Sequence, residues 1–600
     1  MDKIAVLDFG GQYAHLIANR VRRLGVYSDI FDGEVKAEEL RDGGYKGLIL
    51  SGGPQSVHEE GSLTADSGIF ELGVPVLGIC YGHQVIASLL GGRVDRGKVR
   101  EYGLANVSVL NHGELFADLG EDEPAWMSHF DQVVEAPEGF EVVAKTADCP
   151  IAGMWDKDRR IYSVQFHPEV THTPNGMKVL DRFVDICEVS RDWSLEKFID
   201  QEVAAIKDKV GDKKVFMLVS GGVDSTVAFT LLEKALGNDR VFGLFVDIGF
   251  MRKGEVEQVE KALRGLGITG LRVEDASSEY FEALEEVYEP EQKRGIIGKL
   301  FLDVQKRVFA DMKLDPEEWI LGQGTIYPDT IETGGTKHAD TIKTHHNRVP
   351  EIQALIDAGQ VIEPIAQLYK DEVRGVGEKL GLPGPMVWRH PFPGPGLAVR
   401  CLCNEEVGGD VEDLSELNSR IGSAGAKYDA RVLPVKSVGV QGDVRSYQHP
   451  VVLSGGEKDF VELEAASISL TNAFAEVNRG LYLLSGNVED LELKKVYLTG
   501  GRISVLQEAD DIVMSFIREK GLEKEIWQFP TVLVPLGKAG GSGESIVLRP
   551  VESEEAMTAN FYKMDFELLD ELVERLEKVE GVDAVFYDIT NKPPATIEWE

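Results

Sequence analysis

Cysteines and long hydrophobic runs are both scarce in this chain of 600 residues. Five cysteines, an odd number scattered along the sequence, argue against a disulfide framework and favour a reducing compartment, so we expect the cytoplasm. No apolar run is long enough to span a bilayer, so we expect no membrane partner. The N-terminal residues go straight into a strand pattern, which leaves no room for a signal peptide.

Basic residues are also few for a chain whose length suggests about three or four domains. Lys and Arg number 63 against 102 Asp and Glu, and the formal net charge is −39. This charge opposes non-specific binding of nucleic acid, which needs surplus positive charge, so we expect no nucleic-acid partner. It predicts a strongly solvated surface, and a salt-adapted source is a further hypothesis.

A glycine turn at Ser220–Ser225 lies between the apolar run Val215–Val219 and a helical pattern from Thr226. Such a turn directs backbone N–H groups and the positive end of a helix dipole at one point, which suits an anion. No Gly-Lys-Ser/Thr follows, which excludes the Walker loop of kinases and GTPases. An ordinary strand-to-helix turn is the alternative interpretation.

The turn resembles the pyrophosphate loop of ATP pyrophosphatases. The resemblance implies that ATP is a co-substrate cut into AMP and pyrophosphate, so that the other substrate is adenylated rather than phosphorylated. The residues that we expect to contact ATP are Ser220, Gly221, Gly222, Val223, Asp224, Ser225, Val246 and Lys343.

The first third of the chain predicts a parallel α/β sheet. Strand-like runs at Ile4–Phe9, Gly47–Leu50 and Val74–Ile79 alternate with helical patterns such as Gln12–Leu24. The third run leads into Gly78-Ile79-Cys80-Tyr81-Gly82. This spacing is typical of a nucleophile elbow, which exposes the sulfur at a helix N-terminus and lowers the pKa of the thiol.

A base and an orienting carboxylate follow much later, after the strand-like run Ile161–Phe166. His167 and Glu169 supply with Cys80 the three groups that a thiol nucleophile needs. Each residue taken singly is more often structural. Together they predict a cysteine hydrolase.

Residues 1–190 resemble class I glutamine amidotransferases. The resemblance implies that Cys80 attacks the side-chain amide of glutamine and releases ammonia. It also implies an oxyanion hole from the N–H groups of Gly53 and Tyr81, with Gln84 near the bound glutamine. Ser128–Asp131 matches the loop that contacts glutamine in this family.

Acidic residues beyond strand ends suggest a magnesium site in the middle third. Candidates are Asp224, Asp329 and Glu332, because carboxylates there suit Mg²⁺ bound together with phosphate oxygens. Solvated loop acids are an equally good interpretation of each one. The basic stretch 337–347 is a plausible lid over phosphates, with Lys343 or Arg348 as the cation that reaches them.

The whole chain resembles the GMP synthase family. Matching segments occur in the same order, and the most specific are Arg389–Leu397 and the tail Lys592–Glu600. The resemblance implies a ligase that aminates xanthosine monophosphate (XMP) to GMP, the last step of de novo GMP synthesis. Nitrogen would come from glutamine, and the nucleotide would pass through an adenylated intermediate. It also implies XMP contacts from Asp443, Arg445, Arg549, Lys592 and Glu598.

We therefore expect an α/β multidomain fold: an amidotransferase sheet over residues 1–190, an ATP pyrophosphatase sheet of the adenine-nucleotide α-hydrolase type over 191–400, and an α+β module over 401–600. Arg431–Asp443 and Thr531–Glu544 both read P-x₄-G-x₂-G-[DE]. Each precedes a helix pattern (Val461–Val477, Phe566–Val579) and a strand (Leu481–Leu484, Ala584–Tyr587). This predicts duplication into about 401–490 and 491–600. Unrelated glycine turns are the alternative.

The module over 401–600 resembles that of the longer form of the GMP synthase family, in which the XMP-binding and dimerisation module is expanded. The resemblance predicts a monomer, or a homodimer with a different contact from that of shorter family members. Three rival functions remain open: an NAD synthase or asparagine-type amide former, an RNA-thiolating enzyme, and a non-catalytic nucleotide sensor. The tail Lys592–Glu600 argues against the first, the net charge of −39 against the second, and the Cys80, His167 and Glu169 set against the third.

Overall fold

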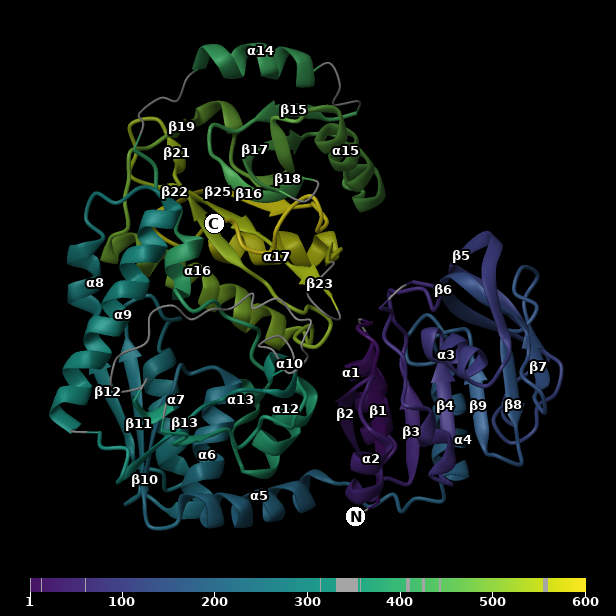
Figure 1. Cartoon of the computed structure of the whole chain (residues 1–600). Coiled ribbons are helices and arrows are strands. Elements are labelled where there is room, and N and C mark those ends of the chain that lie inside the picture. Colours follow the sequence, from purple (N-terminus) through teal and green to yellow (C-terminus); the bar gives the residue numbers. More distant parts are fainter. Residues whose placement is uncertain are drawn as a thin grey trace. The chain divides into compact units, whose positions relative to one another are not determined.

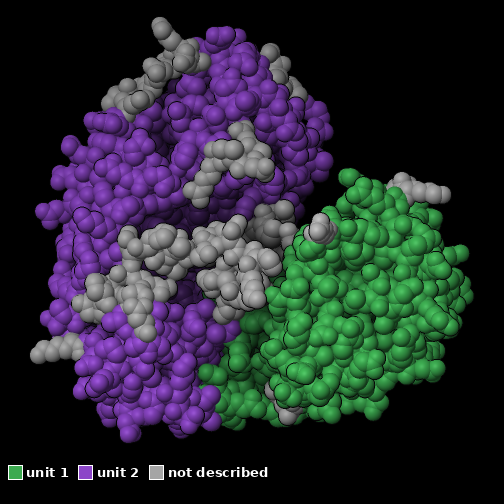
Figure 2. All heavy atoms as spheres, in the orientation of Figure 1, with its two compact units in different colours: residues 1–202, 326–344, 367–369 green, residues 203–325, 345–366, 370–600 purple. Residues whose placement is uncertain are grey.

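A computed structural model describes residues 2–11, 13–59, 61–312, 314–330, 354–356, 358–405, 411–422, 427–441, 444–553 and 559–600. They form two compact units (Figure 2). Unit 1 comprises Met1–Glu202, Ile326–Thr344 and Gln367–Tyr369, and unit 2 comprises Val203–Thr325, His345–Ala366 and Lys370–Glu600. Within these described ranges, no helix is both long and apolar enough to cross a membrane.

Unit 1 is built on a nine-stranded sheet of order β2-β1-β3-β4-β9-β8-β7-β5-β6. The first five strands in this order are parallel, as the sequence predicts. Several are buried along their whole length because helices cover the sheet (Figure 1). The elements are β1 (Lys3–Asp8), β2 (Tyr27–Asp32), β3 (Gly47–Leu50), β4 (Val76–Ile79), β9 (Ile161–Val164), α1 (Ala14–Arg23), α2 (Ala37–Gly43), α3 (Tyr81–Leu89) and α4 (Gly176–Ile186).

The other half of this sheet is antiparallel and was not predicted. It contains β5 (Arg93–Val109), β6 (Asp122–Glu135), β7 (Glu141–Lys145) and β8 (Gly153–Asp156). The prediction that Ser128–Asp131 is a loop is wrong, because these residues lie inside β6. Ser128 pairs with Tyr102 of β5 and His129 pairs with Glu101, so the long ladder keeps this segment extended.

Unit 2 begins with a five-stranded parallel sheet of order β12-β11-β10-β13-β14. Its strands are β10 (Lys214–Leu218), β11 (Val241–Asp247), β12 (Leu271–Asp275), β13 (Trp319–Gly322) and β14 (Val361–Ile362). The described α-helices between residues 195 and 387 are α5 (Leu195–Val210), α6 (Val223–Leu236), α7 (Glu255–Gly265), α8 (Ser277–Ala283), α9 (Pro290–Met312), α10 (Tyr327–Thr330), α12 (Lys370–Lys379) and α13 (Gly384–Val387). Of these, α10 and the start of α5 belong to unit 1.

The C-terminal part of unit 2 carries a seven-stranded sheet. Six strands follow an order mirrored about its centre, β15-β17-β18-β25-β22-β20, and the seventh, β16, pairs with β17 beside this path. On each side an antiparallel pair is followed by a parallel pair, and β18 and β25 meet antiparallel in the middle. The elements are β15 (Asp429–Val432), β16 (Ser437–Gln441), β17 (Val444–Ser454), α15 (Phe460–Ala473) and β18 (Val477–Ser485), then β20 (Thr531–Val534), β21 (Leu536–Lys538), β22 (Glu544–Leu548), α17 (Phe566–Leu576) and β25 (Val582–Asp588). Two stretches with the same element order therefore face each other, and their origin by duplication stays a prediction.

Smaller elements complete this module. They are α14 (Val411–Gly422), α16 (Gly500–Glu519), β19 (Leu491–Leu493) paired with β21, and β23 (Val551–Glu552) paired with β24 (Asn560–Phe561). One hydrophobic cluster runs from Phe216 and Leu321 of the parallel sheet to Leu506 and Tyr587 of the C-terminal module. The two sheets of unit 2 thus share a continuous core.

Candidate functional site

The nucleophile candidate Cys80 occupies a tight turn between β4 and α3. Its φ is +52°, a left-handed conformation that costs a non-glycine residue energy. The flanking residues must be small: a Cβ on Gly78 would lie 2.7 Å from the Gly82 oxygen, and a Cβ on Gly82 would lie 2.3 Å from the Leu50 oxygen. The sequence therefore forms the strained turn that places the sulfur at the N-terminus of α3.

His167 and Glu169 are brought together in the same unit. His167 Nδ1 and Glu169 Oε1 are 2.7 Å apart, and both side chains are buried. Burial by itself lowers the pKa of His167. The Glu169 charge and the interaction with Cys80 outweigh burial and raise the pKa well above 6.5. A Cβ on Gly52 would lie 3.1 Å from His167 Cε1 and 3.7 Å from Cys80 Cβ, so a glycine is needed for this close approach.

The predicted oxyanion residues lie beside each other. A Cβ on Gly53 would be 3.1 Å from Tyr81 Cδ1. Among the described residues, none accepts a hydrogen bond from the main-chain N–H of Gly53 or of Tyr81. Gln84 is buried, and its Nε2 donates to the Asp131 oxygen at 2.7 Å and to Gln165 Oε1 at 3.3 Å. Gln84 thus holds β6 against α3 in this state.

A buried group on β5 and β6 fixes the backbone next to the thiol. The Cys80 thiol donates to the Ser128 oxygen at 3.7 Å. The next residue, His129, has Nε2 at 3.0 Å from Glu101 Oε2 and Nδ1 at 3.1 Å from the Asp131 oxygen. Cys149 completes a group whose possible ligand atoms all lie within 4.8 Å of one another. Burial raises the pKa of the Cys149 thiol to about 12. We interpret the group of Glu101, His129 and Cys149 as a support that holds strand β6 in place through hydrogen bonds.

The glycine turn of unit 2 forms the predicted strand-turn-helix structure between β10 and α6. Gly221 has φ +76°, and a Cβ there would lie 2.9 Å from the Phe245 ring. The hydroxyl oxygens of Ser220 and Ser225 are 3.1 Å apart, and Ser225 Oγ accepts from the Ser220 N–H at 3.2 Å. Helix α6 begins at Val223, so its first N–H groups have no acceptor within the helix. The turn has the geometry of an anion site.

Asp224 pairs with a lysine that the sequence did not single out. Lys370 Nζ contacts Asp224 Oδ2, and Asp224 Oδ1 is buried without a hydrogen-bond partner among the described residues. Lys370 begins α12, far along the chain, and no local motif marks it. Val246 is buried in β11. Asp329 Oδ2 accepts a hydrogen bond from the Ile326 N–H at 3.2 Å. Asp329 belongs to unit 1.

Part of the predicted lid and nucleotide contacts lies outside the described residues. Those positions are Glu332, Lys343, Arg348 and Asp443, and of Arg445 the structure describes the main chain in β17. Lys592 is half-buried, and burial lowers its pKa.

The C-terminal tail and the proline-glycine run meet at Glu598. The Glu598 carboxylate accepts from Arg400 at 2.7 and 3.0 Å and from Gln528 Nε2 at 3.1 Å. Gln528 Nε2 also lies 3.2 Å from the Pro391 oxygen. A Cβ on Gly396 would lie 2.3 Å from the Phe250 oxygen, so the end of the run packs directly on the backbone after β11. Sequence reasoning missed Arg400 and Gln528, because neither lies in a recognisable motif.

Arg549 does not have the accessible position expected of a residue that contacts substrate. It is fully buried, and Nη1 donates to Asp588 Oδ1 at 3.0 Å while Nη2 donates to the Thr596 oxygen at 3.3 Å. Its guanidinium therefore lies beneath the tail and supports it from inside.

Parts of the chain match three protein-family models. Residues 5–187 match the family model described as glutamine amidotransferase class-I, residues 193–300 match NAD synthase, and residues 515–599 match the GMP synthase C-terminal domain. The crystal structure of a protein from Thermoplasma acidophilum, described as one subunit of a GMP synthase, is 36% identical and covers 31% of this chain and 94% of its own, with a TM-score of 0.29.

Full-length relatives carry the same description. The chain is 48% identical to a protein of Leptospira interrogans described as a probable glutamine-hydrolysing GMP synthase, over 100% of this chain and 99% of that protein. It is 40% identical to the glutamine-hydrolysing GMP synthase of Staphylococcus carnosus, over 100% of this chain and 99% of that protein. The chain therefore belongs to the glutamine-hydrolysing GMP synthase family.

Proposed function

We propose that this chain is a ligase that aminates XMP to GMP with nitrogen from glutamine, converting ATP to AMP and pyrophosphate. The observation that carries the proposal is similarity to glutamine-hydrolysing GMP synthases along the entire chain. The arrangement of Cys80, His167 and Glu169 and the anion-binding turn at Ser220–Ser225 support it independently.

Glutamine hydrolysis would proceed through a thioester. The Cys80 thiol passes its proton to His167, and the sulfur attacks the side-chain amide carbon. The negative oxygen that forms accepts hydrogen bonds from the N–H groups of Gly53 and Tyr81. His167, held by Glu169, gives a proton to the departing ammonia. Water then attacks the thioester with His167 as the base, which releases glutamate and restores the thiol.

Adenylation would occur at the glycine turn. The 2-oxygen of the xanthine ring attacks the α-phosphorus of ATP, and pyrophosphate leaves toward the N–H groups at the start of α6. Asp224 would hold Mg²⁺, since its Oδ1 is buried without a hydrogen-bond partner in the described part of the chain. When bound, the metal ion supplies positive charge that screens the phosphate oxygens.

Amination would complete the reaction. Ammonia attacks the adenylated carbon, and AMP leaves with the former 2-oxygen of xanthine on its phosphate. Lys592 and Arg445 are the cations that we assign to the XMP phosphate in a chain of net charge −39. We assign to Asp443 and Glu598 polar contacts near the same nucleotide, and to Lys343 or Arg348 a contact with ATP.

The remaining assignments follow from the sequence. We propose domains over 1–190, 191–400 and 401–600, a cytoplasmic location, no nucleic-acid partner, and a monomer or homodimer. The described cysteines are all free, which supports a reducing compartment.

The test is to supply purified protein with ATP, Mg²⁺, glutamine and one acceptor at a time, and to measure AMP and the aminated product. We expect AMP and GMP to appear with XMP, and neither product to appear with deamido-NAD, aspartate or tRNA. AMP formation with one of those acceptors, and none with XMP, would replace this proposal by the corresponding rival.

A further inference from the structure

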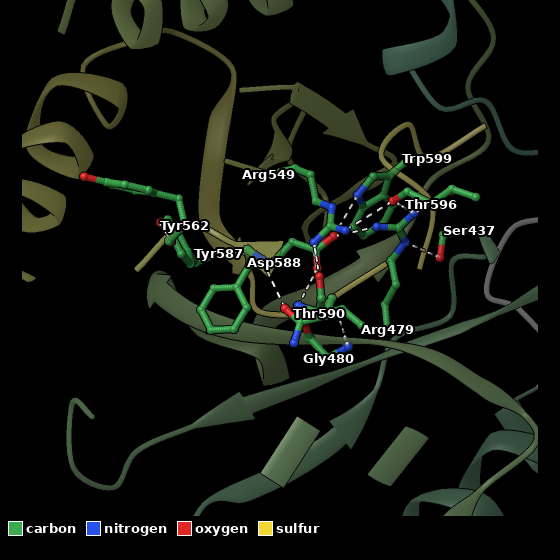
Figure 3. Close-up of polar contacts among 12 residues, drawn as sticks. Ser437, Arg479, Gly480, Arg549, Tyr562, Tyr587, Asp588, Thr590, Thr596 and Trp599 are labelled. Carbon is green, nitrogen blue, oxygen red and sulfur yellow. Dashed lines mark hydrogen bonds and ion pairs between the residues drawn. The ribbon is translucent and has the colours of Figure 1, made fainter. Parts of the chain in front are cut away.

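A fully buried charged centre lies in the middle of the C-terminal sheet, where two arginines converge on one aspartate (Figure 3). Arg479 comes from β18 in the first half of the module, and Arg549 and Asp588 come from the second half. Arg479 Nη1 is 2.7 Å from Asp588 Oδ2, and Arg549 Nη1 is 3.0 Å from Asp588 Oδ1. All three side chains have no exposed surface.

A buried charged centre of this kind contributes little net stability to a protein core. Burying charges costs several kcal/mol per ion, and apolar residues of similar volume often serve stability equally well. Two guanidinium groups share one carboxylate, so the local charge is unbalanced. Burial lowers the pKa of Arg479 to about 10. Such a centre is best explained by what its hydrogen bonds hold in place.

Most donors of Arg479 go to the C-terminal tail and to the strand beside it. Nη2, which carries two hydrogens, lies 3.0 Å from each of four oxygens: the main-chain oxygens of Val438, Thr596 and Glu598, and Thr596 Oγ1. The guanidinium carbon also lies 4.8 Å from the centre of the Trp599 ring. A single side chain of the first half thus contacts three residues in the tail of the second half.

The tail also lies against strand β16 of the first half. The Val438 N–H donates to the Trp599 oxygen at 2.9 Å, and the Val440 N–H donates to the Pro594 oxygen at 2.7 Å. A Cβ on Gly439 would lie 2.9 Å from the Pro594 oxygen and 2.8 Å from Asn478 Nδ2. The glycine therefore permits a backbone approach that a larger residue would prevent.

We infer that Arg479 is a positioning residue of the nucleotide site, through which the first half of the module holds residues 592–600 in their binding shape. The inference rests on the proposed function for the identity of the nucleotide. It assigns to the first half a role in shaping the nucleotide site, since residues from both halves of the chain hold the tail.

The test compares two buried arginines of the same module. Arg479→Met removes the contacts with the tail. Arg502→Met is the matched control, because Arg502 is also buried and paired, with Glu544 at 2.6 Å, and its hydrogen bonds go to groups outside the tail. Each variant is assayed with saturating ammonium in place of glutamine, and hydrogen exchange of the full-length protein is followed over peptides covering 592–600.

We expect Arg479→Met to raise the KM for XMP at least tenfold, with the KM for ATP within twofold of the parent, and to accelerate exchange of the tail. Arg502→Met is expected to lower Tm while leaving the KM for XMP and tail exchange unchanged. Arg479→Lys keeps the charge without the planar fork, so it should give an intermediate KM.

If Arg479→Met leaves both the hydrogen exchange of residues 592–600 and the KM for XMP unchanged, the inference is wrong. It is also wrong if Arg479→Met and Arg502→Met change these two quantities equally. If Arg479→Met does not fold, Gly439→Ala tests the same contact through the close approach to Pro594, with the same two readouts and the same expected direction. Failure of the parent enzyme to aminate XMP would instead reject the proposed function, and tail exchange would still decide the positioning role.

Discussion

At the scale of the residue, the amidotransferase site is governed by the charge on His167. Burial favours the neutral imidazole, whereas Glu169 at 2.7 Å and the neighbouring Cys80 favour the charged form and prevail. Because the folded pKa of His167 is raised, its proton stabilises the folded state below the ordinary pKa of 6.5. That stability is lost as the pH rises through the raised value.

Replacing the nucleophile should separate the two reactions. Cys80→Ala removes the thiol and leaves unit 2 untouched, so we expect no GMP formation with glutamine and near-parental formation with ammonium salts. Both rates are measured on one preparation. Loss of both rates would give Cys80 a structural role instead.

Removing the carboxylate that orients the histidine should change the pH profile. In Glu169→Gln the raising effect of the Glu169 charge disappears while burial still lowers the pKa, so the pKa of His167 falls. We expect the alkaline limb of glutamine-dependent activity to move to lower pH and the rate to fall about 10²-fold. If the alkaline limb does not move, a group other than His167 controls it. The ammonium-dependent rate is the control, because it does not need the amidotransferase site and should stay unchanged.

At the scale of the element, both reactive turns join a parallel strand to a helix. Each uses a backbone conformation with positive φ, at Cys80 between β4 and α3 and at Gly221 between β10 and α6. A helix N-terminus then faces the site in each case. The sequence predicts these turns well because the strand, the small residues and the helix are adjacent in the chain.

A methyl group at the second turn should damage ATP use. In Gly221→Ala the residue is held at φ +76°, which costs about 1–2 kcal/mol, and its Cβ would press on the Phe245 ring at 2.9 Å. We expect kcat/KM for ATP to fall at least tenfold while glutaminase activity persists.

Gly298→Ala is the matched control for this substitution. Gly298 lies inside α9 with nothing within 4 Å of a new Cβ, so alanine should stabilise the helix by about 1 kcal/mol and leave kinetics unchanged. Equal kinetic effects at the two glycines would contradict the special role of Gly221.

Other elements depend on contacts that sequence patterns do not carry. The predicted helix Val461–Val477 ends at Ala473, because Phe474 is already extended and Val477 begins β18. Both residues are buried, so they continue the apolar spacing beyond the real end of the helix. The antiparallel strands β5 to β8 were also missed, although β5 with β6 and β7 with β8 are consecutive strands of the chain.

At the scale of the whole molecule, the C-terminal sheet is built from two halves of one chain. Its two mirrored stretches meet at β18 and β25 inside one chain. The high negative charge of −39 adds a repulsion between copies at low salt.

Of the two states proposed above, monomer and homodimer, we therefore predict the monomer. Light scattering is expected to give a mass of about 66.1 kDa at both low and high salt. A species of twice this mass that depends on residues 580–600 would contradict the prediction, because that segment would then be shared between copies.

The sequence by itself determined the chemistry. Cys80 and the Ser220–Ser225 turn are recognisable because each motif is local, and local backbone geometry follows directly from glycine placement. The tertiary structure decided how the nucleotide end is supported. Arg400 and Glu598 are 198 residues apart in the chain, and Arg479 and Asp588 are 109 residues apart. Their pairing depends on sheet order and on the burial of charge, which no spacing in the sequence encodes, and it buries Arg549 against Asp588.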